Sequence, residues 1–231
     1  MKIIGHRGAA AVLPENTLVS FGRAWEIGAD GVELDVRLTS DGEVVVFHDD
    51  DGQRLAGIVA RVAETPYAVL AGWRVRGETV PRLEEVLAQA PPHALTLIEI
   101  KCGPEIWPKL EPILSKFRER PIGLLTFHAE LAAEAACKFP NVPVLLNLEP
   151  AALAQLETWV TFAVDHLLAG LSIGWSDALD QRAVRLIHRH QLLLAVWTVN
   201  DPAVLRMALS LGVDLLMTDD PGAMMVQVHR G

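Results

Sequence analysis

The sequence predicts an α/β fold, a (β/α)₈ barrel with a β-hairpin extension and a short insertion after the hairpin. Short β-rich runs alternate with helix-forming patterns along the whole chain, as expected for repeated βα units around a parallel sheet. Eight such runs can be counted, and 231 residues suit a compact TIM barrel. The expected barrel strands are residues 3–5, 31–36, 95–101, 122–126, 142–146, 166–171, 193–198 and 214–217.

The first helix is predicted from its end signals. It begins after a cap at Asn16 or Thr17 and ends near Gly28. Its apolar residues recur at helical spacing and should be buried. They are Leu18, Phe21 and Trp25.

A late helix has still clearer end signals. Asp201 is its expected N-cap, Pro202 lies in its first turn, and Gly212 follows its end. Two prolines inside residues 105–119 predict a broken or kinked helix there. The remaining helices are expected at residues 82–90, 129–138, 151–160 and 182–190.

Residues 49–80 fit no simple βα unit. They contain charges and scattered glycines without a sustained period, so we expect a crossing loop or a small subdomain. No low-complexity tract or interdomain linker interrupts the chain. We therefore expect residues 1–231 to form a single barrel domain that includes this short insertion.

Composition excludes several classes of function. With 51% hydrophobic and 21% charged residues the chain is globular, and its formal net charge of -9 argues against a nucleic-acid partner, leaving a small-molecule substrate. No stretch approaches the roughly 20 apolar residues that cross a bilayer, so no stable membrane insertion is expected. Two cysteines and the absence of a secretory signal pattern predict a cytoplasmic protein.

Acidic and apolar residues alternate strictly in residues 31–36. This alternation places Glu33 and Asp35 on one strand face, and in a barrel the apolar face packs against helices, so both acids should point inward. Glu99 and Lys101 repeat the spacing near the C-terminal end of their strand, where barrel enzymes place their chemistry. The four side chains should meet at one mouth of the barrel.

A histidine is expected beside these acids because of a hairpin. The Asp-Gly pair at positions 41 and 42 lies between two β-rich runs, which is a strong signal for a two-residue loop. If Ser40 pairs with Glu43, counting back along the strands places Asp35 opposite His48. Directly opposed residues share a face of the ladder, so this register predicts that His48 lies next to the carboxylates.

The three acids need a compensating positive charge. Glu33, Asp35 and Glu99 cannot all stay ionised at close range without a compensating charge, and an all-oxygen set favours Mg²⁺ or Ca²⁺ over zinc. We therefore expect one divalent cation. His6 and Arg7 end the first strand, where a guanidinium can clamp phosphate oxygens. Two histidines near a metal suit general acid and base roles at neutral pH.

Eight short segments, spread in order along nearly the whole chain, carry a family resemblance. They are His6-Arg7-Gly8, Glu15-Asn16-Thr17, Val32-Glu33-Leu34-Asp35-Val36, Phe47-His48-Asp49, Pro81-Arg82-Leu83-Glu84-Glu85-Val86-Leu87, Ile98-Glu99-Ile100-Lys101, Val196-Trp197-Thr198-Val199-Asn200 and Thr218-Asp219-Asp220-Pro221. One tripeptide alone is weak evidence, but eight segments in register are specific. The chain resembles the glycerophosphodiester phosphodiesterase family.

The resemblance implies a metal-dependent hydrolase. Its substrates would be glycerophosphodiesters such as glycerophosphocholine and glycerophosphoethanolamine, cleaved into glycerol 3-phosphate and an alcohol. By this likeness the metal ligands are Glu33, Asp35 and Glu99. The attacking nucleophile, water or a substrate hydroxyl, is left open, as are the choice between Mg²⁺ and Ca²⁺ and the oligomeric state.

The same resemblance assigns the remaining site residues. His6 and His48 would be the acid-base pair, one activating the nucleophile and the other protonating the leaving alcohol. Arg7 and Lys101 would contact phosphate. Trp197 either packs in the core or forms one wall of the substrate pocket.

Two alternatives use the same residues. The segment after His48 is shorter than is usual in the family, which leaves room for a lysophospholipase D-like phosphodiesterase. A Schiff-base aldolase-type barrel would use Lys101 as its nucleophile, but the converging carboxylates argue against it. Glu15 and Asn16 are expected to cap the first helix rather than touch substrate.

Overall fold

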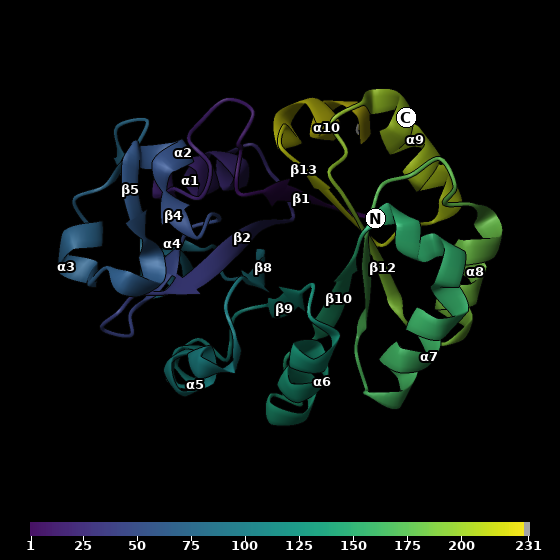
Figure 1. The fold of residues 1–231 in the computed structure, drawn as a ribbon. Helices are drawn as coiled ribbons and strands as arrows, with labels where there is room; N and C mark the ends of the chain where they lie inside the picture. The colour runs from purple at the N-terminus through teal and green to yellow at the C-terminus, as the bar shows by residue number, and fades with distance from the viewer. Residues whose placement is uncertain (229–231) are drawn as a thin grey trace.

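The structure, a computed structural model, describes residues 1–228 and confirms the predicted barrel (Figure 1). All eight barrel strands run parallel, and β1 pairs with both β2 and β13, which closes the ring. The barrel strands are β1 (Lys2–His6), β2 (Gly31–Leu38), β8 (Leu95–Ile100), β9 (Ile122–Thr126), β10 (Val144–Leu148), β11 (Gly170–Gly174), β12 (Leu193–Trp197) and β13 (Leu215–Thr218).

Helices surround the barrel and follow the predicted end signals. The Thr17 hydroxyl caps α1 by accepting from the Ser20 N–H, Asp201 caps α9, and Gly212 ends α9 with a φ of 83°. Within the described residues no helix is both long and apolar enough to cross a membrane. The helices are α1 (Leu18–Glu26), α4 (Leu83–Gln89), η2 (Pro104–Ile106), α5 (Trp107–Lys116), α6 (Ala129–Lys138), η3 (Pro150–Gln155), α7 (Leu156–Asp165), α8 (Gln181–Arg189), α9 (Pro202–Leu211) and α10 (Pro221–Val228).

The apolar side chains form two main layers. Val32, Leu34 and Val36 of β2 pack in the outer layer between sheet and helices, so the acids between them point into the barrel as predicted. The inner layer fills the barrel below those acids. Its buried members are Ile4, Leu97, Leu125, Leu145, Ala195, Leu215 and Met217.

The predicted hairpin register is wrong by one residue. Thr39, not Ser40, faces Glu43, because its N–H donates to the Glu43 carbonyl at 3.0 Å and the loop has three residues. Gly42 has a φ of 84°, the left-handed conformation that ends a three-residue hairpin loop. Phe47 therefore lies opposite Asp35, and its N–H donates to the Asp35 carbonyl at 2.9 Å. His48 lies one residue past that position.

The sixth barrel strand begins later than predicted. Residues 166–171 were expected in the strand, but α7 continues to Asp165 and Leu167 turns the chain with a φ of 57°. The strand β11 starts at Gly170, where any Cβ would collide with the Leu193 carbonyl of the neighbouring strand. A continuous apolar run does not separate the end of a helix from the start of a strand, which explains the error.

Smaller differences concern element ends. The strand predicted at 142–146 lies at 144–148, and the helix predicted at 151–160 begins as the 3₁₀ turn η3 before α7 continues it to Asp165. The helix predicted at 105–119 starts as η2 and continues as α5 with Pro112 inside it. The C-terminal helix α10 was not predicted.

The insertion after the hairpin forms a small folded unit beside β2, on the side of the barrel away from β10 to β12 (Figure 1). Phe47 packs edge-on against Trp73 at 5.8 Å, in an apolar cluster that also includes Val45. The strand segment that leads to His48 is thereby anchored on the insertion. The hairpin's second strand is β3 (Val44–Val46), and the elements of the insertion are β4 (Asp51–Gly52), α2 (Gln53–Ala56), β5 (Ile58–Arg61), η1 (Val62–Glu64), α3 (Tyr67–Leu70), β6 (Arg74–Val75) and β7 (Glu78–Thr79).

Candidate active site

Three carboxylates meet inside the C-terminal mouth of the barrel. Glu33 and Asp35 come from β2 and Glu99 from β8, where Asp35 and Glu99 are direct neighbours in the register. One carboxylate oxygen of each lies within 4.8 Å of the others. The residues are 1%, 1% and 7% exposed, so water screens their repulsion little.

Their protonation reflects this crowding. Burial and the Asp35 charge raise the pKa of Glu33 to about 8, and the same two causes raise the pKa of Glu99. Burial opposes ionisation of Asp35, but Arg7, Lys101, His48 and the hydrogen bond from Asn16 together lower its pKa. Without a cation, the three carboxylates therefore resist being ionised at the same time.

The acid cluster fits a divalent cation. Asp35 Oδ1 and Glu99 Oε1 are buried and accept no hydrogen bond from the described residues, although the Lys101 ammonium lies close to both. Buried carboxylate oxygens with free lone pairs are ligands that hard cations such as Mg²⁺ and Ca²⁺ prefer. The three acids could therefore hold a metal ion, as predicted.

A tight turn after β1 brings Arg7 to this cluster. Gly8 has a φ of 89°, and a Cβ there would lie 2.7 Å from the Ser20 carbonyl carbon, so only glycine fits. Arg7 itself has a φ of 54°, and its N–H donates to Glu33 Oε2 at 3.1 Å. Its Nε lies 3.2 Å from Asp35 Oδ2.

Lys101 is the second cation at the mouth. Its Nζ lies 3.3 Å from Asp35 Oδ1 and contacts Glu99. These acids outweigh the effect of burial and raise the pKa of Lys101, which keeps it an ammonium. A Schiff-base nucleophile needs a neutral amine, so this environment is wrong for the aldolase alternative.

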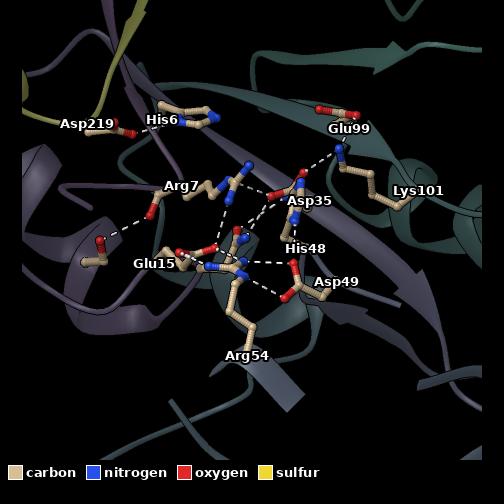
Figure 2. A network of polar contacts seen from close by, with 12 residues as sticks. His6, Arg7, Glu15, Asp35, His48, Asp49, Arg54, Glu99, Lys101 and Asp219 are labelled. Atoms are coloured by element: carbon tan, nitrogen blue, oxygen red, sulfur yellow. Dashed lines mark hydrogen bonds and ion pairs between the residues drawn. The ribbon is translucent and has the colours of Figure 1, made fainter. Parts of the chain in front are cut away.

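Each of the two histidines is held at Nδ1 by an aspartate (Figure 2). His6 Nδ1 lies 2.7 Å from Asp219 Oδ1, while its Nε2 faces Glu33 at 3.9 Å. His48 Nδ1 lies 2.6 Å from Asp49 Oδ1. Burial lowers the pKa of His48, whereas Asp219 and Glu33 overcome burial and raise the pKa of His6.

These groups surround a cavity of about 300 Å³. Seven of the eight predicted site residues line it, and Asp35 lies buried beneath. Trp197 is among the seven and also packs against the inner core layer, so it combines both predicted positions. The lining residues are His6, Arg7, Glu33, His48, Glu99, Lys101, Leu125, Phe127, Asn147, Glu149, Trp197 and Met217.

Several residues of the site were not predicted. Glu15 and Asn16 were expected to cap α1, but Glu15 accepts from Arg7 Nη1 at 2.8 Å and Asn16 Nδ2 donates to Asp35 Oδ2 at 2.8 Å. Asp49 and Asp219 hold the histidines. Glu15, Asn16, Asp49 and Asp219 stand in the matched segments quoted above, which was the only signal for them.

The chain has recognisable relatives. Residues 6–223 match the Glycerophosphoryl diester phosphodiesterase family. A glycerophosphodiester phosphodiesterase of Caldanaerobacter subterraneus subsp. tengcongensis is 29% identical over 99% of this chain and 98% of its own length. One of Bacillus subtilis is also 29% identical, over 94% of this chain and 83% of its own. The crystal structure of a glycerophosphodiester phosphodiesterase from Thermotoga maritima has a TM-score of 0.85 at 28% identity, covering 98% of this chain and 97% of that one.

Proposed function

This chain belongs to the glycerophosphoryl diester phosphodiesterase family, and we propose that it hydrolyses glycerophosphodiesters to glycerol 3-phosphate and an alcohol. The proposal depends on one observation: three buried carboxylates, two histidines and the cationic side chains of Arg7 and Lys101 meet around one cavity of about 300 Å³. Glycerophosphocholine and glycerophosphoethanolamine are the substrates we expect.

The two histidines supply the proton transfers in this proposal. With Nδ1 held by an aspartate, each presents Nε2 as the free nitrogen, and His6 Nε2 already faces the acid cluster. One removes the proton of the attacking hydroxyl group while the other protonates the leaving alcohol oxygen. The attacking group is water or a hydroxyl of the substrate's own glycerol.

In this proposal the cationic side chains of Arg7 and Lys101 orient the phosphate group of the substrate. Arg7 and Lys101 both line the cavity and lie beside the acids, where they can donate to the phosphoryl oxygens. The Trp197 ring meets the Phe127 ring edge-on at 5.5 Å and provides an apolar wall for the rest of the substrate.

We propose that Glu33, Asp35 and Glu99 hold one divalent cation, either Mg²⁺ or Ca²⁺. One oxygen of each acid lies close to the others, and the buried Asp35 Oδ1 and Glu99 Oε1 accept no hydrogen bond from the described residues, which supports this assignment. When bound, such an ion neutralises the acids and polarises the phosphoryl oxygens.

We also propose that the barrel and residues 49–80 act as one domain, because the apolar cluster of the insertion includes Val45 and Phe47 of the hairpin.

The net charge of -9 supports a small-molecule substrate rather than nucleic acid. Cys102 and Cys137 are both free thiols, which agrees with a location in the reducing cytoplasm.

A substrate panel tests the proposed activity. Purified protein with Mg²⁺ or Ca²⁺ should release glycerol 3-phosphate from glycerophosphocholine and glycerophosphoethanolamine. A lysophospholipid in the same panel tests the lysophospholipase D alternative, and we expect slower turnover because the cavity is small. Absence of turnover for every glycerophosphodiester with both ions would refute the proposal.

Activated substrates test the roles of the histidines. His6→Ala and His48→Ala should each lose roughly 10²- to 10⁴-fold in rate on glycerophosphocholine. A nitrophenolate leaving group needs no proton. On a glycerophosphodiester that carries this group, only the variant that lacks the general acid should therefore regain a rate close to that of the wild-type protein. Equal recovery of both variants would contradict the division into acid and base.

A further inference from the structure

Arg54 lies on α2 of the insertion and binds two carboxylates at once (Figure 2). Its Nε and Nη2 contact the two oxygens of Asp49 at 2.7 and 2.8 Å. Its Nη1 and Nη2 contact the two oxygens of Glu15 at 3.0 and 2.8 Å. Only the planar fork of a guanidinium can serve two carboxylates in this way. Arg54 therefore joins the loop before α1 to the loop after β3.

Each of these carboxylates holds one residue of the cavity. Asp49 contacts His48 Nδ1 at 2.6 Å, and Glu15 accepts from Arg7 Nη1 at 2.8 Å. Arg54 is thus the junction of two chains of contacts. One ends at a proposed acid-base histidine and the other at the proposed phosphate-binding arginine.

Arg54 lies outside the cavity. Its side chain is 49% exposed, and it is not among the described residues that line the cavity. Arg54 nevertheless lowers the pKa of both Asp49 and Glu15. The hydrogen bonds from Arg54 are the largest cause that brings the pKa of Asp49 to about 2, and they help to lower the pKa of Glu15 against its burial.

We propose that Arg54 is a positioning residue that fixes His48 and Arg7 together, so that the insertion after His48 takes part in catalysis. The inference rests on the function proposed above. Without Arg54, Asp49 and Glu15 each lose two hydrogen bonds and keep their contacts to His48 and Arg7, but nothing on the insertion then fixes the orientation of these two pairs. Loss of such a supporting contact typically costs about 10- to 100-fold in activity.

Arginine variants and added guanidinium ion test the proposal. Arg54→Ala should lower kcat on glycerophosphocholine about 10- to 100-fold with the metal saturating, and guanidinium ion far below denaturing concentration should restore part of the loss. The kcat of Arg54→Lys should also be low, because an ammonium group cannot bridge both carboxylates. A purely structural role of Arg54 would not produce rescue by guanidinium.

Arg61→Ala is the matched control. Arg61 is an exposed arginine of the same insertion whose ion pairs go to Asp50 and Glu64, away from the cavity. This variant should keep the wild-type kcat and show no response to guanidinium. A wild-type kcat in Arg54→Ala, or a loss that guanidinium leaves unchanged, would overturn the proposal.

A second measurement does not depend on the substrate. In the wild-type protein the ¹⁵N signals of the His48 ring, assigned by comparison with His48→Gln, should show one tautomer with the proton on Nδ1. In Arg54→Ala these signals should broaden or average, whereas those of His6 should not change. If the wild-type protein turned over no glycerophosphodiester, the proposed function would fail while this test of Arg54 remained valid. Unchanged His48 signals in Arg54→Ala would overturn the positioning role.

Discussion

The two histidines of the cavity are matched by two aspartates, each bound to an Nδ1 atom. Asp219 is itself fixed by Asn200, whose Nδ2 donates to Asp219 Oδ2 at 2.7 Å and whose Oδ1 accepts from the Asp219 N–H at 2.9 Å. A partner on Nδ1 selects the tautomer and the orientation of the ring. The aspartates should therefore matter for rate although neither is expected to react.

Replacement of Asp219 tests this idea. Asp219→Asn removes the charge beside His6 Nδ1 and should lower kcat roughly 10- to 100-fold, as measured by initial rates on glycerophosphocholine. Asp214→Asn is the matched control, because Asp214 also binds a histidine, His188 at 2.9 Å, but precedes β13 at the other end of the barrel. Equal effects of the two substitutions would contradict a specific role for Asp219.

Metal binding should depend on pH through Glu33. Its pKa is raised from 4.5 to about 8 in the protein without metal, so the folded state binds this proton more tightly than the unfolded state. The resulting stability is fully present below pH 4.5 and is lost as the pH rises towards 8. A cation must displace the proton, so its affinity should increase over the same range.

Calorimetric titration in buffers of different ionisation enthalpy measures this coupling directly. Binding of Mg²⁺ or Ca²⁺ at neutral pH should release about one proton, and Glu33→Gln should reduce both the release and the pH dependence, leaving the part that belongs to Glu99. An affinity that does not change between pH 5 and pH 8 would show that Glu33 is not a ligand.

At the residue scale the sequence predicted the groups that follow a simple period. Glu33, Asp35 and Glu99 alternate with apolar residues, so their inward direction could be derived. The partners of the site could not, because His6 and Asp219 are 213 positions apart and Arg54 and Glu15 are 39 apart. No local pattern encodes contacts over such distances, and only the closed fold brings them together.

At the scale of elements, the hairpin shows how a correct location can follow from a wrong register. Asp-Gly suits both a two-residue loop and the three-residue loop that forms here, and the two differ by one position in pairing. His48 was expected opposite Asp35, a place that Phe47 takes. His48 reaches the cavity because it lies beyond the ladder, where its carbonyl accepts from Arg37 Nε at 2.9 Å.

Gly57 and Gly8 both have a positive φ, and replacing each by alanine distinguishes the cost of backbone strain from the cost of steric crowding. Gly57 in the insertion has a φ of 70° with open space around it, so Gly57→Ala should cost about 1 kcal/mol of unfolding free energy. Gly8 has a φ of 89° and faces the Ser20 backbone, so Gly8→Ala should cost about 1 to 3 kcal/mol more and displace Arg7. Denaturant unfolding measures both costs. Equal destabilisation by the two substitutions would contradict the crowding at Gly8.

At the scale of the whole molecule, ring closure builds the site. The pairing of β1 with both β2 and β13 brings His6, Glu33 and Asp219 to one mouth from both ends of the chain. This placement follows from the barrel predicted from alternating strands and helices, since parallel strands of a closed ring end on the same side. Without a metal ion, the three buried carboxylates of this mouth repel one another.

A bound cation should therefore stabilise the whole fold. A divalent ion at 100 times its Kd should add about 2.7 kcal/mol to the unfolding free energy, measured by thermal unfolding across an ion titration. Asp35→Asn should abolish the gain. Glu84→Gln should retain it, because Glu84 lies on the surface and pairs with Lys116. An ion-independent melting temperature in the wild-type protein would argue against the site.

The most direct test of the central claim is glycerol 3-phosphate release from glycerophosphocholine by protein stripped of metal with a chelator. We predict that the stripped protein is inactive, that Mg²⁺ or Ca²⁺ restores turnover, and that neither ion restores it in Glu99→Gln. Full activity in the stripped protein would contradict the account.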